Sequence, residues 1–192
     1  MMEQGNLPTQ RVNISTQKML GGIGSILILL VFMPGTVATL LGIVGVVLWF
    51  ISIYQLSDIL RKPSIFKKVL IGFILNIVGT VIAFAFGLTA GISLSAYVRG
   101  ETGITSGLGL LAVAIIVAYA ISLAAFYFYK EAFDILAQAT VHNLFKIAGL
   151  LMFIGAITTI LFGLGILLII VGYIVLAVAF FTAPKEVEVQ GT

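Results

Sequence analysis

MLGGIGSILILLVFMPGTVATLLGIVGVVLWFISIYQLS, from Met19 to Ser57, contains no charged residue. A single helix of that length would measure about 58 Å, roughly twice the thickness of the hydrocarbon core of a bilayer. The stretch must therefore fold back on itself. Pro34-Gly35 is the natural place, because proline lacks an amide proton and glycine accepts positive φ. The stretch thus predicts two membrane spans, at about 18–33 and 37–56.

The composition extends this conclusion to the whole chain. Of the 192 residues, 61% are hydrophobic and 9% are charged, whereas soluble proteins carry about a quarter charged residues. So few charges cannot cover a water-facing surface, and the apolar runs are long enough to cross a bilayer. We therefore expect an all-α, polytopic integral membrane protein. Its expected partner is the lipid bilayer in which it is embedded.

The same composition excludes several function classes. The chain has no cysteine, which rules out disulfides, thiolate chemistry and cysteine-ligated metals. Its single histidine, His142, cannot form a histidine-based metal cluster or a two-histidine haem site alone. The formal net charge of +3 does not predict nucleic-acid binding, because no water-exposed domain is available to carry a basic patch.

Four further spans follow the first two, at about 69–95, 108–129, 147–162 and 165–183. A loop from Tyr97 to Gly107 separates the third from the fourth, and the last two fold back near Phe162 to Gly165. The expected organisation is a polar, mobile cytoplasmic tail (1–17), a six-span membrane domain (18–184) and a second cytoplasmic tail (185–192).

The basic residues set the expected orientation, because lysine and arginine are retained on the cytoplasmic side. With six spans arranged as three hairpins, nine of the ten basic residues lie on one side and Arg99 alone on the other. We therefore expect both termini, and the segments that link the hairpins, in the cytoplasm, with the chain in the cell membrane.

Two charged phrases form these linkers: DILRKPSIFKK (Asp58 to Lys68) and DILAQATVHNLFK (Asp134 to Lys146). The second has the spacing of an amphipathic helix lying at the interface, whereas Pro63 shortens the first to an elbow. The outer hairpins also echo each other, since Lys18–Gly21 and Gly35 match Lys146–Gly149 and Gly163 at one offset. Either the three hairpins form a parallel repeat, or the biased composition produces the matches by chance.

Small residues mark one face of the third span: Gly79, Ala83, Gly87 and Gly91, each four positions after the last. This spacing forms a ridge along which another helix can approach closely. The fourth span has Ala114, Ala118 and Ser122 at the same spacing, so we expect these two spans to form the tightest pair.

Asn76 and Thr80 are the candidate polar residues inside the membrane. They could form a polar station in a solute pathway or a helix–helix hydrogen bond, and the lack of charged residues in the spans favours the second interpretation.

Arg61, Lys62, Lys67 and Lys68 form the densest basic cluster. They are candidate contacts for anionic lipid, although retention of positive charge in the cytoplasm explains them equally well, and both roles can coexist.

Aromatic residues gather near the expected cytoplasmic boundary: Trp49, Tyr54, Tyr127, Tyr129, Phe180 and Phe181. A lipid or quinone pocket could use them, but an aromatic belt requires no ligand and is the favoured interpretation.

All seven acidic residues fall in predicted tails and loops, and no phosphate-binding glycine motif occurs. We therefore expect no enzymatic activity, no cofactor and no metal site.

Several phrases resemble a family of archaeal and bacterial membrane proteins, the domain of unknown function 996. They are STQKMLGGIGSILILL (Ser15 to Leu30), QLSDI and SIFKKVLIGFI (within Gln55 to Ile74), FDILAQATVHNLFKIAGLLMFIGAITTI (Phe133 to Ile160) and LAVAFFTAP (Leu176 to Pro184). The resemblance covers most of the chain from Ser15 to Pro184 and implies a prokaryotic protein with several spans. It implies no activity and no site residues, since the family is named for lacking a known function.

Together these features predict a non-catalytic helical subunit or scaffold that packs against itself or other membrane-protein subunits. A channel or carrier for a small solute is the alternative, with Asn76 and Thr80 as its polar wall.

Overall fold

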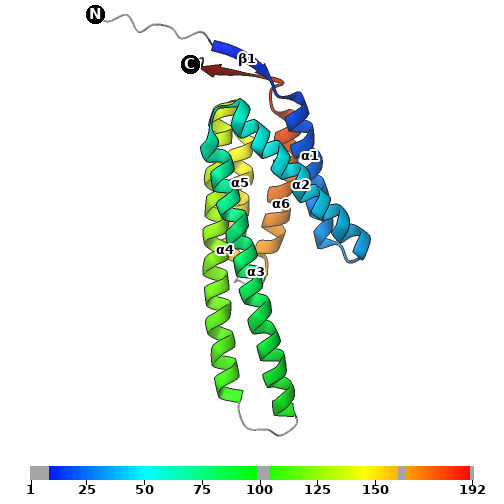
Figure 1. Cartoon of the computed structure of the whole chain (residues 1–192), viewed down its shortest axis with the longest axis vertical. Coiled ribbons are helices and arrows are strands. Elements are labelled where there is room, and N and C mark those ends of the chain that lie inside the picture. The colour runs from blue at the N-terminus through cyan, green and yellow to red at the C-terminus, as the bar shows by residue number, and fades with distance from the viewer. Residues whose placement is uncertain (1–8, 99–103, 160–162, 191–192) are drawn as a thin grey trace, which may run out of the picture.

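The computed structural model describes residues 9–98, 104–159 and 163–190. Within these ranges the chain is helical apart from two short strands (Figure 1). The elements are β1 (Thr9–Asn13), α1 (Ser15–Leu29), the 3-10 helix η1 (Leu30–Phe32), α2 (Thr36–Ile59), α3 (Pro63–Val98), α4 (Ile104–Thr140), α5 (Leu144–Thr158), α6 (Gly165–Thr182) and β2 (Glu186–Gln190). The predicted all-α class is therefore confirmed for the helices, and the strands are an addition to it.

Among the described residues, five helical segments are long and apolar enough to cross a membrane. They are Ser15–Phe32, Thr36–Ile59, Pro63–Leu88, Leu111–Thr140 and Gly165–Thr182. The remaining helix, α5, is apolar but has 15 residues, fewer than the roughly 20 that a span usually needs. It overlaps the predicted span 147–162, of which residues 160–162 are outside the described part, as are Arg99 and residues 1–8 of the predicted N-terminal tail.

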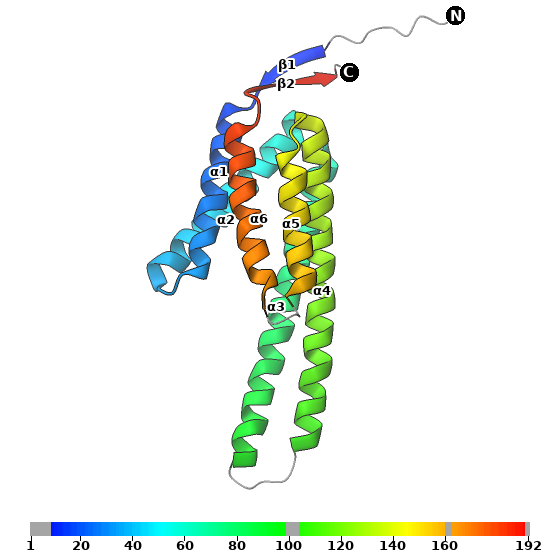
Figure 2. The same ribbon diagram turned by 180° about the vertical axis from the view of Figure 1, so that it is seen from behind.

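The six helices follow one another around the molecule. The most extensive contacts join α3 with α4, α1 with α2, and α5 with α6, and further contacts join α4 with α5 and α1 with α6. The contact between α2 and α3 is the least extensive of the neighbouring pairs. Figures 1 and 2 show that α1 and α2 lean away from α3 and α4 as they leave the end with the strands, and that α3 and α4 run far past the other helices.

The core lies at the end of the molecule that carries the strands. Side chains from several helices are fully buried there: Ile53 and Leu56 of α2, Ile65 and Val69 of α3, Phe133 and Leu136 of α4, Phe145 of α5, and Leu176 and Phe180 of α6. Trp49 packs edge-on against Tyr129 and Phe133, with ring centroids 6.1 and 6.2 Å away. This packing joins α2 to α4 within that core.

The aromatic residues correct one prediction. Trp49, Tyr129 and Phe180 are 5%, 6% and 0% exposed, so they belong to the core and not to a lipid-facing belt. Tyr54, Tyr127 and Phe181 are exposed, as belt residues would be. The positions of these aromatic residues along the chain do not distinguish the buried group from the exposed group, because both groups lie near the same predicted membrane boundary.

Both charged phrases close a helix in the same way. After α2, the Lys62 amide donates to the Ser57 carbonyl at 2.9 Å and the Arg61 amide to the Asp58 carbonyl at 3.0 Å, the pattern of a Schellman motif. Arg61 takes a left-handed conformation, with φ of 52°, and α3 then begins at Pro63. After α4, Val141 has φ of 51° and the His142 amide donates to the Ala137 carbonyl at 3.0 Å.

The second phrase differs from its prediction. The expected separate interfacial helix is absent from the described residues, because α4 continues without a break to Thr140. Its Glu131 and Asp134 therefore lie on a helix and not in a loop. Each has a basic partner: Glu131 pairs with Lys68 of α3, and Asp134 with Lys130 at 2.7 Å.

The echo between the outer hairpins has a structural counterpart. Gly24 of α1 packs on Gly45 of α2, and Met152 of α5 packs on Gly172 of α6. Met152 follows Gly24 by 128 positions (152 − 24), the offset from Lys18 to Lys146 (146 − 18), and Gly172 follows Gly45 by 127 (172 − 45). The turns of the two hairpins contain Gly35 and Gly163, which both have positive φ and are again 128 positions apart (163 − 35).

The two ends of the chain are paired. β1 and β2 form an antiparallel two-stranded ribbon in which Arg11 lies opposite Glu188 and Asn13 opposite Glu186 (Figure 2). The Ile14 amide donates to the Lys185 carbonyl at 2.9 Å, and the Lys18 ammonium group bonds to the Ala183 carbonyl. The segments predicted as polar tails thus hold each other in residues 9–13 and 186–190, beside the start of α1 and the end of α6.

The close contact between α1 and α2 gives a testable prediction. A Cβ added to Gly24 would lie 2.7 Å from the backbone nitrogen of Trp49 and 2.8 Å from the carbonyl oxygen of Gly45, and neither atom can rotate away. We expect Gly24→Ala to lower the free energy of unfolding by about 1–3 kcal/mol, the usual cost of overpacking. Thermal unfolding of the purified protein in mild detergent measures this loss.

Gly87→Ala is the matched control, because nothing lies within 4 Å of a Cβ added there. We expect the control to unfold at the wild-type temperature or slightly above it, since alanine favours a helix over glycine. Equal unfolding temperatures for the two variants would contradict the close approach of α1 and α2.

Candidate functional site

The small-residue ridge of α3 divides into two parts. Gly79 is buried, and a Cβ added there would lie 3.4 Å from Ile121 of α4, which is ordinary contact. Gly87 and Gly91 have nothing within 4 Å of an added Cβ, and Ala83 is exposed. The structure therefore places the first residue of the ridge against α4 and leaves the later ones open.

Sequence reasoning missed a close contact between α3 and α4 at Gly72. A Cβ added there would lie 2.9 Å from the Ala125 carbonyl oxygen and 2.9 Å from the Tyr129 ring. Gly72 precedes Gly79 by seven residues, so both lie on one face of the helix. A search for small residues at seven-residue spacing, in addition to four, would have found it.

Asn76 and Thr80 have different surroundings. The Asn76 side chain lies close to the Tyr129 hydroxyl of α4 and interacts with it. The Thr80 hydroxyl donates to the Asn76 carbonyl of its own helix at 2.8 Å. Asn76 thus lies at the contact between α3 and α4, whereas Thr80 satisfies its polar group locally, as threonine commonly does in a helix.

A cavity of about 300 Å³ lies between α3, α4, α5 and α6. Thr80, Tyr119, Ser122 and Thr159 contribute hydroxyl groups to a lining that is otherwise apolar, and Gly79 and Ala83 form part of its wall. The Tyr119 hydroxyl donates to the Ile157 carbonyl at 2.7 Å, and the Thr159 hydroxyl to the Gly155 carbonyl at 2.8 Å. Hydroxyl oxygens whose protons are engaged in this way can still accept a hydrogen bond from a bound molecule.

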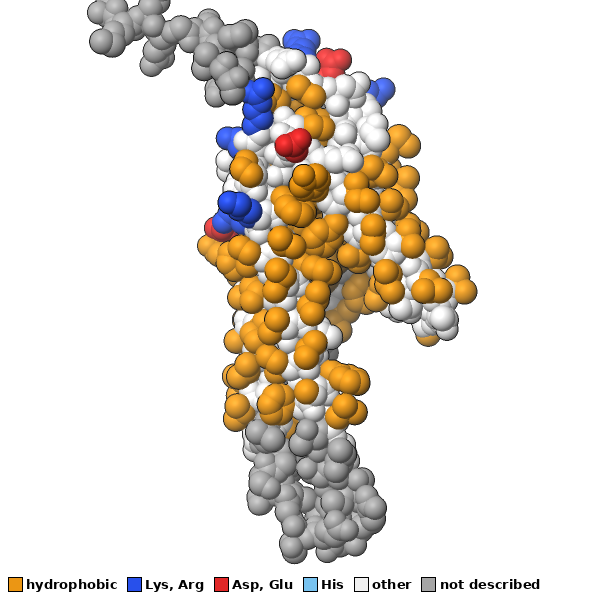
Figure 3. Space-filling model, viewed as in Figure 1, with side chains coloured by type: hydrophobic (Ala, Val, Ile, Leu, Met, Phe, Trp, Pro, Cys, Tyr) orange, Lys and Arg blue, Asp and Glu red, His pale blue; other side chains and the backbone are white. Residues whose placement is uncertain are grey.

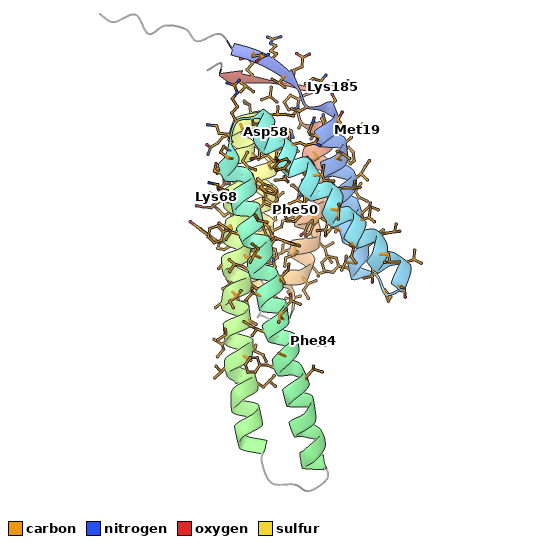
Figure 4. The ribbon with its side chains drawn as sticks, in the orientation of Figure 1. Met19, Phe50, Asp58, Lys68, Phe84 and Lys185 are labelled. Atoms are coloured by element: carbon orange, nitrogen blue, oxygen red, sulfur yellow. The ribbon has the colours of Figure 1, made fainter. Side chains whose placement is uncertain are left out.

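The basic cluster also divides. Lys68 pairs with Glu131 and lies 5.9 Å from the centre of the Phe128 ring, so it faces α4. Arg61 and Lys67 instead line a hollow of about 400 Å³ between the end of α2 and the start of α3. Lys62 is exposed outside this hollow. Asp58 and Lys68 lie at the end of the molecule that carries the strands (Figure 4).

The surface shows the same division of charge. Basic and acidic side chains gather near the strands, and hydrophobic side chains cover the visible flanks of the helices beyond them (Figure 3). Among the described residues, no group of three or more His, Cys, Asp or Glu side chains could hold a metal ion. His142 lies at the charged end, with Nε2 3.0 Å from the Thr182 hydroxyl.

A largely helical chain has several apolar helices of membrane-spanning length, and the charged side chains on the visible face of its described residues gather near the strands. This is the architecture of a multi-pass membrane protein. The chain belongs to the family described as protein of unknown function (DUF996), whose pattern matches residues 41–174. The predicted membership is thereby confirmed. An uncharacterised protein from the archaeon Methanocaldococcus jannaschii is 34% identical over 179 residues, covering 93% of this chain and 97% of that protein. No solved structure matches the chain.

The contact between Asn76 and Tyr129 gives a testable prediction. Asn76→Ala and Tyr129→Phe each remove one partner of this contact and should lower the free energy of unfolding slightly. If the two side chains are hydrogen-bonded, the loss in the double variant should fall short of the sum of the two single losses by about 0.6 kcal/mol, the usual strength of a hydrogen bond between membrane helices. Thermal or steric-trap unfolding in bicelles measures the stability of the wild type, of both single variants and of the double variant.

Independent, fully additive losses would contradict a direct bond between the two side chains. If the protein conducts a solute, Asn76→Ala should leave the flux unchanged. Lost flux with intact stability would instead assign Asn76 to a pathway.

Proposed function

We propose that the chain is a non-catalytic, six-span subunit of the cell membrane that packs, through α3 and α4, against a second copy or another membrane protein. The observation that carries this proposal is the open face of α3 beyond Gly79. There α3 and α4 run past the other helices (Figures 1 and 2), and no described atom of a neighbouring element lies within 4 Å of a Cβ added at Gly87 or Gly91. Small residues at four-residue spacing allow another helix to approach closely.

The paired termini support an even number of spans. Because β1 and β2 are hydrogen-bonded, the start of α1 and the end of α6 lie on the same side of any membrane that the chain crosses. Five helices have the length of a span, and α5 packs along α6 as its partner. A sixth span formed by the shorter α5, with local thinning of the bilayer, satisfies both facts. The excess of basic residues at this end supports its cytoplasmic location.

The orientation of the chain in the membrane can be tested by chemical labelling. The chain has no cysteine, so single introduced cysteines can report which side of the membrane each segment faces. In spheroplasts, a membrane-impermeant maleimide should label Thr102→Cys, in the loop between α3 and α4. Gln10→Cys and Glu186→Cys should react only after the membrane is permeabilised. Labelling of one terminus but not the other in intact cells would contradict the six-span arrangement.

Assembly through α3 can be tested at Gly87. If the open face of α3 is an interface, Gly87→Leu should shift the protein in nanodiscs from an oligomer or complex to a smaller species. The reason is that a leucine side chain keeps the partner helix away. Light scattering coupled to size exclusion measures the mass. Gly87→Ala is the control and should keep the wild-type assembly, since it changes the same residue without filling the ridge. Unchanged assembly with leucine would show that the ridge faces lipid.

A channel or carrier for a small solute is the second candidate, and the cavity beside Thr80 favours it. Its hydroxyl-bearing wall could accept hydrogen bonds from a weakly polar solute. Solute flux in proteoliposomes that Thr80→Leu blocks and Val81→Leu does not would favour this function over the scaffold. Val81 is 60% exposed on the same helix and does not line the cavity, so it is a suitable control.

A further inference from the structure

The hollow between the end of α2 and the start of α3 has the features of a binding site. Its volume is about 400 Å³. Tyr54, Pro63 and Phe66 supply apolar and aromatic surface, and Asp58, Arg61 and Lys67 supply charge. A hollow that combines a basic edge with an aromatic wall suits an anionic amphiphile better than a fully water-soluble ligand.

The local fold holds the walls of this hollow without a ligand. The Ser57 hydroxyl donates to the Lys62 carbonyl at 2.9 Å, which reinforces the Schellman motif at the end of α2. The motif sets Arg61 in its left-handed conformation. Across the turn, the Tyr54 and Phe66 rings pack edge-on with centroids 5.1 Å apart. The hollow is therefore largely preformed.

The charges fit a phosphodiester. Two cations, Arg61 and Lys67, line the hollow with one carboxylate, Asp58, so the lining has a net charge of +1. One phosphodiester charge balances it. Lys68 does not contribute, because its ammonium group pairs with Glu131 on the other face of α3. The Asp58 carboxylate accepts hydrogen bonds only, so it suits a headgroup that carries hydroxyl groups.

Exposed apolar side chains continue the hollow along both helices. On α2, Val47 and Ile51 precede Tyr54 at helical spacing, and they are 52% and 40% exposed. On α3, Leu70, Ile71 and Ile74 follow Lys67 on the same face and are also exposed. The two helices diverge in this direction (Figures 1 and 2). An acyl or isoprenoid chain attached to the bound phosphate would thus meet apolar surface on two sides.

We propose that this hollow binds the headgroup of one anionic phospholipid, with Arg61 and Lys67 on the phosphate, Asp58 on a headgroup hydroxyl, and the lipid chains between α2 and α3. The site rests on the proposed placement of this end of the molecule at the membrane boundary. The cysteine-labelling experiment tests that placement independently, so its failure and the failure of the lipid site can be told apart.

Native mass spectrometry of the full chain in detergent tests the site with phosphatidylglycerol and, for comparison, phosphatidylcholine. The first phosphatidylglycerol should bind more tightly than the first phosphatidylcholine. Arg61→Gly and Lys67→Gln should each weaken that first binding about fivefold, and the double variant about 25-fold, as expected for one surface cation each. Arg61→Gly should also fold well, because glycine favours the left-handed conformation that Arg61 adopts.

Lys62→Gln is the matched control, since it removes the same charge from the same phrase outside the hollow. It should leave the first binding constant within about twofold of wild type. Equal losses for Lys62→Gln and Lys67→Gln, or equal binding of the two lipids, would overturn the proposal in favour of diffuse attraction. Displacement of the lipid by millimolar inorganic phosphate or glycerophosphoglycerol would also overturn it, because the site would then recognise the soluble headgroup alone.

Discussion

Close approach of helix backbones is the interaction on which this structure depends. Hydrocarbon chains of lipid are as apolar as leucine, so membrane helices gain little by burying apolar side chains against one another and associate mainly through van der Waals contact. Each of the three most extensive helix pairs has a glycine at a place where the two helices approach closely. Gly24 meets the backbone of α2, Gly72 meets that of α4, and Gly155 lies against Gly165 of α6. A methyl group at any of these positions would push two backbones apart.

Periodicity along the chain predicts which face of a helix can be approached, but not which neighbour approaches it. The ridge on α3 illustrates this limit, since Gly79 contacts α4 whereas Gly87 and Gly91, on the same ridge, lie beyond the other helices. The aromatic residues illustrate it again. Trp49 and Tyr54 differ by five residues and lie near the same end, yet Trp49 is buried and Tyr54 is exposed, because each points to a different side of α2. The turn at Gly35 could be predicted from the Pro34-Gly35 pair, whereas the end of α4 could not, because α4 continues through charged residues to Thr140.

The repeated charged phrases have a geometric reason besides their charge. Both end a helix with a residue in the left-handed conformation, and in neither case is that residue glycine. This conformation is unfavourable for a β-branched residue such as Val141, so the surrounding contacts must hold it. At Arg61 the same geometry sets a long cationic side chain at the edge of a hollow. Only the three-dimensional path of the turn separates Arg61 and Lys67 from Lys68, which the sequence groups with them.

The two ends of the molecule are built for different tasks. Near the strands, the terminal ribbon, the buried aromatic side chains and the ion pair between Lys68 and Glu131 join all six helices, so this end is specified by contacts within the chain. Farther along, α3 and α4 continue as a two-helix extension with an open row of small residues. Two helices alone satisfy their backbone hydrogen bonds in lipid, so the extension needs no partner to remain helical. Its small residues leave space beside α3 that lipid chains or another helix must fill, and they allow another helix to approach closely. Assembly through this extension therefore requires no rearrangement of the packed end.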